Sequence, residues 1–466
     1  MASHKHINHR KLILLLLLII SFGIYFYISL HLPMEQAPDE YMRYDVPLYI
    51  FHHGNLPSGF EESIRNSVWG FSYAFTPYGS SLIAALFMKV VGLFTGNAFT
   101  LLVAARLVSV LSGVGTLYFL VKIGRKVFPH SALQYLPAVL CGFLPQFAFL
   151  SAYFNSDVFG IFTTAMIAYG WLYCLEHRWD LRSCLFLGVS IGLCAMSYYN
   201  VYAFILGSIF LFLGDRLLNQ PGLTWKNRLI SLLRPGICIA VVALVLAGWF
   251  FIRNFIMYNG DFLGMDTMYA CGEKYAPDFY KPSNRPTPAN SGVSVIDMLT
   301  KPYMGLMWVS TSIKSFIGVF GYMTAYAPRS IYFVYTLFFA ISIFLGLFYI
   351  ISHSNSVQKR LLAFNGFLCV IVPVILSVKY SYSIDYQPQG RYCIPALLPL
   401  VLWISCGFAW TIEKVKLKKK HLPAHVLSRP QASTLEDRLV VFSASVVYIA
   451  LFFYVMISTL LPLCTV

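Results

Sequence analysis

Long apolar runs separated by short polar segments dominate the pattern of this chain. The first run, KLILLLLLIISFGIYFYISL at residues 11–30, is long enough for a helix to cross the ~30 Å hydrocarbon core of a bilayer. Taken as roughly 12–30, it is followed by similar runs near 100–121, 133–151, 157–174, 183–197, 199–214, 235–255, 330–351, 361–379, 392–412 and 439–462. The pattern predicts an all-α polytopic membrane protein, one integral domain over residues 1–466 with about eleven transmembrane helices.

Two apolar stretches have alternative interpretations. The first run could be a cleaved signal peptide, but no small-residue cleavage site follows it, which favours an uncleaved span. The stretch 79–95 could also cross the membrane. A crossing there would put the basic cluster KIGRK at 122–126 on the outer side, so the positive-inside rule favours a short helix on the outer surface.

The charge distribution sets the expected orientation. The chain is 58% hydrophobic and only 11% charged, with a net charge of +15, and most Lys and Arg fall in the segments assigned to the inner side. A multi-pass protein of the cytoplasmic membrane is therefore expected, with a cytoplasmic N-terminus and a basic cytoplasmic loop at 413–438. Topology and anionic lipid account for the positive charge, so no nucleic-acid partner is expected.

The ten cysteines fall mostly inside the predicted spans, where they act as small apolar side chains. Cys271 and Cys393 are both assigned to the outer side. They could form one disulfide, although sequence alone gives no distance between them.

Two outer segments are much longer than the other connections: a first outer loop at 31–99 and a second outer loop at 256–329. Long loops on a rigid bundle are common places for function. The first begins MEQAPDEYMRYDVPLYIFHHGNLP, which concentrates carboxylates and two histidines beside the first span.

Asp39 and Glu40 are the leading candidates for chemistry in this loop. Adjacent side chains on a helix diverge by about 100°, so these two cannot flank one bond and must have different roles. Their alternative explanation is structural, because acids in a first helical turn complement the helix dipole. Asp39 could also form an i,i+4 ion pair with Arg43.

Further ionisable residues are predicted at the same membrane level. Asp157 and Arg391 stand at the outer starts of two spans, where charge is costly and by default marks a functional site. Asp157 either orients a substrate or caps its helix. Arg253 either contacts lipid phosphate or extends to the interface. His53, with its neighbour His52, could help Asp39 to hold a divalent metal or could simply be solvated.

Four motifs resemble a known superfamily. They are APDE at 37–40, RNFIMYNGD at 253–261, SFIGVFGYMTAYAP at 315–328 and QGRYCIPALLPL at 389–400. In this order they resemble a bacterial branch of the GT-C glycosyltransferases, related to protein mannosyltransferases and lipid A aminoarabinose transferases. The resemblance implies a bundle whose large first outer loop carries short juxtamembrane helices, and an essential acidic residue in that loop, which maps onto Asp39 with Glu40 beside it.

The implied activity is inverting sugar transfer from a polyprenyl-phosphate donor to a glycan, lipid or protein acceptor on the outer face of the cytoplasmic membrane. Because phosphate is a good leaving group, one carboxylate that accepts the acceptor's proton suffices, and Asp39 is the candidate. Arg391 could bind the donor phosphate. No cofactor is required, although a divalent metal is an open alternative. The rival functions are a transporter or flippase for lipid-linked sugars, and an assembly subunit with an inert loop.

Overall fold

The computed structural model describes residues 2–420 and 434–464. The middle of the basic loop predicted at 413–438 lies outside them. The described chain is almost entirely helical, and its one two-stranded sheet pairs β1 (Val319–Phe320) with β2 (Ala325–Tyr326) in antiparallel register. The predicted all-α class is therefore confirmed.

Nine helical segments among the described residues are long and apolar enough to cross a membrane. They comprise α1 (Ala2–His31), α4 (Ala98–Val127), α7 (Asp157–Glu176), α9 (Ala203–Leu218), α10 with α11 (Trp225–Ala243 and Trp249–Met257), α15 (Arg329–His353), α16 (Val357–Ser383), α17 (Leu397–Lys420) and α18 (Leu435–Val455). A π-helical turn at Leu244–Gly248 joins α10 to α11.

The other two predicted spans are helical but shorter. The run at 133–151 is divided into α5 (Leu136–Gly142) and α6 (Pro145–Leu150), because Pro145 starts a new helix and biases Leu144 towards its extended conformation. The run at 183–197 forms α8 (Leu181–Ala195), whose 15 residues extend only about 22 Å. Both pack within the bundle, with α5 against α4 and α17, and α8 against α7 and α10.

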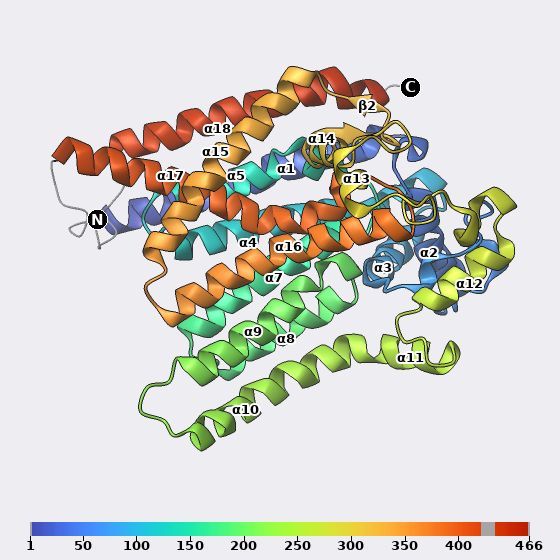
Figure 1. The fold of residues 1–466 in the computed structure, drawn as a ribbon, viewed down its shortest axis with the longest axis horizontal. Coiled ribbons are helices and arrows are strands. Elements are labelled where there is room, and N and C mark those ends of the chain that lie inside the picture. The colour runs from blue at the N-terminus through green and yellow to red at the C-terminus, as the bar shows by residue number, and fades with distance from the viewer. Residues whose placement is uncertain (1, 421–433, 465–466) are drawn as a thin grey trace.

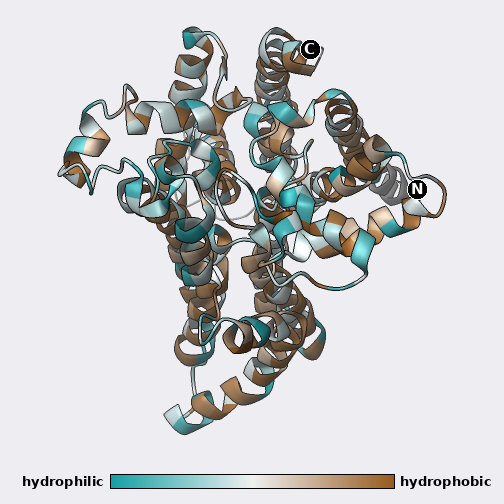
Figure 2. Cartoon of the chain, turned by 90° about the vertical axis from the view of Figure 1, so that its right-hand side faces the viewer, coloured by the Kyte–Doolittle hydropathy of each residue, from teal (hydrophilic) through white to brown (hydrophobic). Residues whose placement is uncertain are grey.

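The connections fall at two opposite ends of the bundle (Figure 1). The segments predicted to be cytoplasmic gather at the end where the N-terminus lies. The two long outer loops, which include α2 (Glu40–His53), α3 (Gly79–Gly92) and α12 (Met265–Tyr275), gather at the other end. Seen from that end, the long helices are predominantly hydrophobic and hydrophilic residues are concentrated in the loops (Figure 2). The predicted division of the loops into two sides is thus reproduced in space.

The loop end is built from short helices. The first outer loop contains α2 (Glu40–His53) and α3 (Gly79–Gly92), so the ambiguous stretch at 79–95 is a short helix. The second contains α12 (Met265–Tyr275), α13 (Val295–Thr300) and α14 (Trp308–Gly318), followed by the β1–β2 hairpin. Cys271 in α12 and Cys393 are both free cysteines, so the suggested disulfide is not formed.

A fully buried ion pair fixes the start of α2. Arg106 of α4 donates from Nε to Oε1 of Glu40 at 2.8 Å and from Nη2 to Oε2 at 2.5 Å. Its Nη1 donates to the carbonyls of Ser29 and Leu32 at the end of α1. Glu40 Oε1 also accepts from the backbone N–H of Phe154 at 2.6 Å. Glu40 thus connects α1, α4 and the segment before α7, and this fixes the backbone of the residue before it.

We expect Glu40→Gln to lower the stability of the protein strongly. The amide cannot neutralise Arg106, and leaving one charge of a buried pair uncompensated costs about 3 kcal/mol or more. The measurement is a melting curve in detergent, with Glu62→Gln as the matched control because Glu62 is exposed in the same loop. Equal melting temperatures for the two variants would contradict this role for Glu40.

Candidate functional site

Asp39 occupies an unusual backbone position immediately before α2. Its φ of 62° and ψ of 5° lie in the left-handed region, which costs a non-glycine residue roughly 1–2 kcal/mol, although Asp tolerates it better than most. The carboxylate makes no capping hydrogen bond to α2. Helix capping therefore does not account for Asp39, and a strained backbone conformation of this kind often marks a functional position.

The partner of Asp39 is Arg391, from a distant part of the chain. Arg391 Nη2 lies 2.6 Å from Asp39 Oδ2, across 352 residues of sequence. Arg391 belongs to a 3₁₀ helix at Gly390–Ala396. This helix packs so closely on α14 that a Cβ at Gly390 would lie 2.1 Å from the backbone nitrogen of Phe316, so only glycine fits there. The Gly-Arg pair thus brings the guanidinium to the end of the bundle.

The surroundings of Asp39 keep its carboxylate ionised. Burial acts to raise the pKa of Asp39, but the guanidinium groups of Arg391 and Arg43 outweigh burial and hold the pKa below its ordinary value. The Arg391 side chain is only 8% exposed, compared with 23% for Asp39. The pair is therefore a charged centre that is largely shielded from water.

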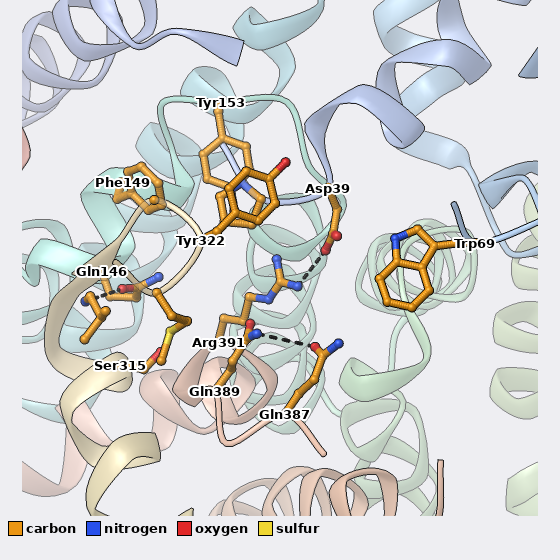
Figure 3. A pocket seen from close by; sticks show the side chains of 14 residues that line it. Asp39, Trp69, Gln146, Phe149, Tyr153, Ser315, Tyr322, Gln387, Gln389 and Arg391 are labelled. Carbon is orange, nitrogen blue, oxygen red and sulfur yellow. Dashed lines mark hydrogen bonds and ion pairs between the residues drawn. The ribbon is translucent and has the colours of Figure 1, made fainter. Parts of the chain in front are cut away.

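This pair lines a cavity of about 150 Å³ at the loop end of the bundle (Figure 3). Trp69 lies on one side of the pair and Tyr322 on the other. The remaining polar lining includes the carboxamides of Gln146, Gln387 and Gln389. Ligand pockets are commonly ~300–1,000 Å³, so the cavity fits a phosphate or a single small ring rather than a complete lipid-linked sugar.

A chain of hydrogen bonds holds the Arg391 side chain in place. Arg391 Nη2 donates to the hydroxyl of Tyr392 at 3.2 Å, and that hydroxyl donates to Gln387 Oε1. Gln387 Nε2 in turn donates to Asp385 at 2.6 Å. Arg391 Nε is buried and has no hydrogen-bond partner among the described residues. The guanidinium is thus held in place and retains a free donor, as an anion site requires.

Asp157 lies beside a second cation. It is the first residue of α7 and only 5% exposed, and its charge acts on Arg43. Arg43 donates to Ser156 Oγ and lies 4.6 Å above the Tyr73 ring, and no Arg43–Asp39 ion pair is formed within the described residues. The alternative explanation of Asp39 as an i,i+4 ion-pair partner of Arg43 is therefore not supported. The capping alternative for Asp157 also fails, because Asn155 Oδ1 accepts from the N–H of Val158.

Four predicted site residues, Asp157 and the three described next, do not line the cavity. Glu40 is enclosed in its ion pair with Arg106, which argues against the predicted catalytic role. Arg253 donates to the carbonyl of Pro57 and to the Tyr78 hydroxyl, so it fastens the first outer loop to α11. His53 is exposed and bonds to the carbonyl of Tyr49 one turn earlier. Neither Arg253 nor His53 contacts Asp39 or Arg391.

The suggested divalent metal has no evident ligand set. Across residues 2–420 and 434–464, no three His, Cys, Asp or Glu side chains gather as a metal site would require. His53 therefore does not join Asp39, and a metal at Asp39 would need other ligands.

The sequence analysis did not identify several of the residues that line the cavity. Gln387 and Gln389 stand within the same QPQGR motif as Arg391, so their closeness in sequence was the available signal. Trp69, by contrast, lies in a loop and has no sequence feature that separates it from the other aromatic residues. Its place beside Asp39 depends on how the two outer loops fold together.

Comparisons with known proteins bear on the class. Residues 76–253, less than half of the chain, match a sequence-family model described as dolichyl-phosphate-mannose-protein mannosyltransferase. No curated protein sequence matches the chain.

Solved structures of low sequence identity resemble the chain over almost its whole length. The oligosaccharyltransferase AglB from Archaeoglobus fulgidus, in complex with an inhibitory peptide and a dolichol-phosphate, has a TM-score of 0.55 at 12% identity, covering 96% of this chain and 55% of AglB. An oligosaccharyltransferase of the same organism, tethered with an acceptor peptide, has a TM-score of 0.52 at 13% identity over 97% of this chain and 55% of its own. ArnT from Cupriavidus metallidurans bound to undecaprenyl phosphate gives 0.49 at 14%, over 97% and 73%.

The fold and the site define a multi-helix membrane protein with a charged cavity at one end of its bundle. The chain shares the fold of AglB, and the family match over residues 76–253 agrees with the resemblance to GT-C glycosyltransferases that its motifs predicted. The chain spans about 55% of the length of AglB, and the family match assigns no substrate.

Removal of the Arg391 charge should reverse the direction of the Asp39 pKa shift. Arg391→Gln removes the main charge that lowers the Asp39 pKa. Burial then raises this pKa, and we expect it to lie above its ordinary value of 3.8. A raised pKa means that folding takes up a proton, so the stability of this variant should fall as pH rises above 3.8 and through the raised pKa. In the wild type, where the pKa is lowered, the Asp39 contribution is lost only as pH falls below 3.8.

Melting curves of purified protein across this pH range measure the effect. The double variant Asp39→Asn/Arg391→Gln is the control, because it has no carboxyl at position 39 to titrate. The difference in stability between the single and the double variant, followed across pH, gives the contribution of Asp39 ionisation. An identical pH dependence of stability in the two variants would contradict the expected pKa shift.

Proposed function

We propose that this protein is an inverting membrane glycosyltransferase that moves a sugar from a polyprenyl-phosphate donor to an acceptor. The observation that carries the proposal is the Asp39–Arg391 pair lining a polar cavity at one end of an apolar bundle. The dolichol-phosphate bound to AglB, which shares the fold, supports a lipid-linked phosphate as the donor.

Arg391 is the proposed contact for the donor phosphate. Its guanidinium presents planar donors suited to phosphate oxygens, and its Nε is buried without a partner among the described residues. During transfer the bond between the anomeric carbon and the phosphate oxygen breaks, and both electrons stay with the phosphate. A fixed guanidinium beside that oxygen stabilises the charge that develops there.

Asp39 is the proposed general base. The acceptor hydroxyl attacks the anomeric carbon from the face opposite the phosphate, and its proton passes to the Asp39 carboxylate. In the described state Arg391 holds this carboxylate, which lowers its pKa and makes it a weak base. A bound phosphate would share the guanidinium, weaken its hold on Asp39 and so raise the basicity of the carboxylate as the donor arrives.

The other predicted residues receive supporting roles. Asp157 and Arg43 form a second charged group close to Asp39, where they would help to orient the acceptor. Glu40 positions Asp39 through its buried ion pair. Arg253 shapes the first outer loop, and His53 takes no part in transfer. No metal enters the proposed steps.

The proposed location is the cytoplasmic membrane, with a cytoplasmic N-terminus and an extracytoplasmic active site. The concentration of basic residues in loops at the N-terminal end of the bundle supports this orientation. Nucleotide sugars are confined to the cytoplasm, so an enzyme active on the other side needs a lipid-anchored donor.

We expect Asp39→Asn to lower the rate of transfer by roughly 100-fold or more, because the amide keeps the size of the side chain but cannot accept the proton. The assay is transfer from a synthetic polyprenyl-phosphate sugar by the purified protein. Asp45→Asn is the matched control, since Asp45 lies in α2, which Asp39 directly precedes, but does not line the cavity, and this variant should keep near wild-type activity. A fully active Asp39→Asn enzyme would refute Asp39 as the base, whereas no transfer by the wild type would favour a transporter of lipid-linked sugars.

Arg391→Lys should weaken donor binding about 10- to 100-fold, since a point charge cannot reproduce the planar guanidinium and a hydrogen bond to a charged group is worth ~1.5–3 kcal/mol. Binding of polyprenyl phosphate to the purified variant is the measurement. Arg253→Lys is the comparison variant, because Arg253 also lies near the loop end but away from the cavity. If Arg253→Lys alone weakens binding, the donor phosphate is held there instead.

A further inference from the structure

Trp69 forms one wall of the cavity and is fixed by the second outer loop. The guanidinium carbon of Arg285 lies 4.9 Å from the centroid of the indole, and the ring of Tyr280 contacts it edge-on at 5.5 Å between centroids. The next residue, Gly70, has a φ of +73°, and a Cβ there would lie 2.5 Å from the nitrogen of Ala276. Trp69 is therefore held in a defined place while still lining the cavity beside Asp39.

The Trp69 wall belongs to the loop side of the cavity rather than to the bundle. Trp69 comes from the first outer loop, and the two residues that support it come from the second. Arg391, by contrast, lies in the 3₁₀ helix directly before α17, and Tyr153 lies in the segment that leads into α7. A lipid-linked donor reaches the cavity from the bundle, so a molecule that contacts Trp69 enters from the aqueous side, as an acceptor would.

The carboxamides of the cavity retain hydrogen-bonding groups for a ligand. Gln146 accepts from the N–H of Val319 through Oε1, and Gln389 donates from Nε2 to Gln387. For the described part of the chain, no partner is recorded for Gln146 Nε2 or for Gln389 Oε1, and the buried hydroxyl of Tyr153 also has none. The cavity thus offers separate donors and acceptors, and sugar hydroxyls can act as both.

We propose that the acceptor is a glycan, and that its terminal sugar ring stacks on Trp69 while Gln146 and Gln389 bind its hydroxyls; this inference rests on the function proposed above. A pyranose has an apolar C–H face and a polar rim, which match an electron-rich indole face bordered by carboxamides. An extended peptide would instead need a row of backbone partners along an edge.

The test compares acceptors with a polyprenyl-phosphate sugar as donor and the purified full-length chain as enzyme. The probes are a panel of methyl pyranosides and a Ser/Thr-containing peptide. We expect transfer to at least one pyranoside and none to the peptide. In Trp69→Ala the KM for that pyranoside should rise about tenfold, with a much smaller change in kcat, and Trp69→Phe should recover most of the affinity.

Two further variants make the test specific. Phe94→Ala is the matched control, because Phe94 is an exposed aromatic residue of the same first outer loop as Trp69 but does not line the cavity, and the KM of this variant should stay at the wild-type value. Gln389→Ala probes the site from another element and should also raise KM, which keeps the inference testable if Trp69→Ala does not fold.

The outcomes separate this inference from the function on which it rests. Transfer to the peptide alone, or an unchanged pyranoside KM in Trp69→Ala and Gln389→Ala, would overturn the glycan acceptor while the transferase stands. Failure of the wild type to bind polyprenyl phosphate or to consume the donor, including by hydrolysis without an acceptor, would overturn the proposed function and this inference with it.

Discussion

The ion pair between Asp39 and Arg391 is the interaction on which the site depends. It joins residues near the two ends of the chain, and each partner reaches it through a strained or tightly packed backbone: left-handed at Asp39, and pressed against α14 at Gly390. A buried ion pair seldom adds net stability, because the cost of desolvating two charges offsets their attraction. Its retention here is better explained by the position it gives to both side chains.

Neighbouring contacts serve to hold this pair. Glu40 turns away from Asp39 and bonds to Arg106, which fixes the backbone on one side. On the other side, Tyr392 and Gln387 support the guanidinium. The proposed reaction needs a base and a phosphate contact within one small cavity. Before the donor binds, the Asp39–Arg391 ion pair keeps the carboxylate and the guanidinium in place, and the donor phosphate then competes with Asp39 for Arg391. The pair is thus a preorganised centre whose strength also limits the basicity of Asp39 until the donor binds.

The sequence predicted the features that depend on composition and local pattern. Apolar runs located the long helices, and the distribution of Lys and Arg separated the loops into the two groups seen at opposite ends of the bundle. Asp39 and Glu40, for which different roles were predicted, have different partners, Arg391 and Arg106. Asp39 was identified from the carboxylates of the first outer loop and from the motif resemblance, and Arg391 as a costly charge at the membrane level; the structure brings them together.

Features that depend on contacts between distant segments could not be predicted. Nothing local marks Arg106 as the partner of Glu40, and Arg43 was paired with Asp39 because i,i+4 spacing is the only proximity that a sequence displays. Trp69 acquires its position from the packing of two outer loops. The division of one predicted span at Pro145 was visible as a proline, but whether such a residue ends a helix or only bends it depends on its neighbours.

The most direct test of the central claim is a structure of the protein with polyprenyl phosphate bound, determined by electron cryo-microscopy in a lipid nanodisc. The account predicts phosphate oxygens within hydrogen-bonding distance of the Arg391 guanidinium, and an Asp39 carboxylate that has lost its 2.6 Å contact with Nη2 and faces the cavity. A phosphate bound elsewhere, for example at Arg253, with the Asp39–Arg391 pair intact, would contradict it.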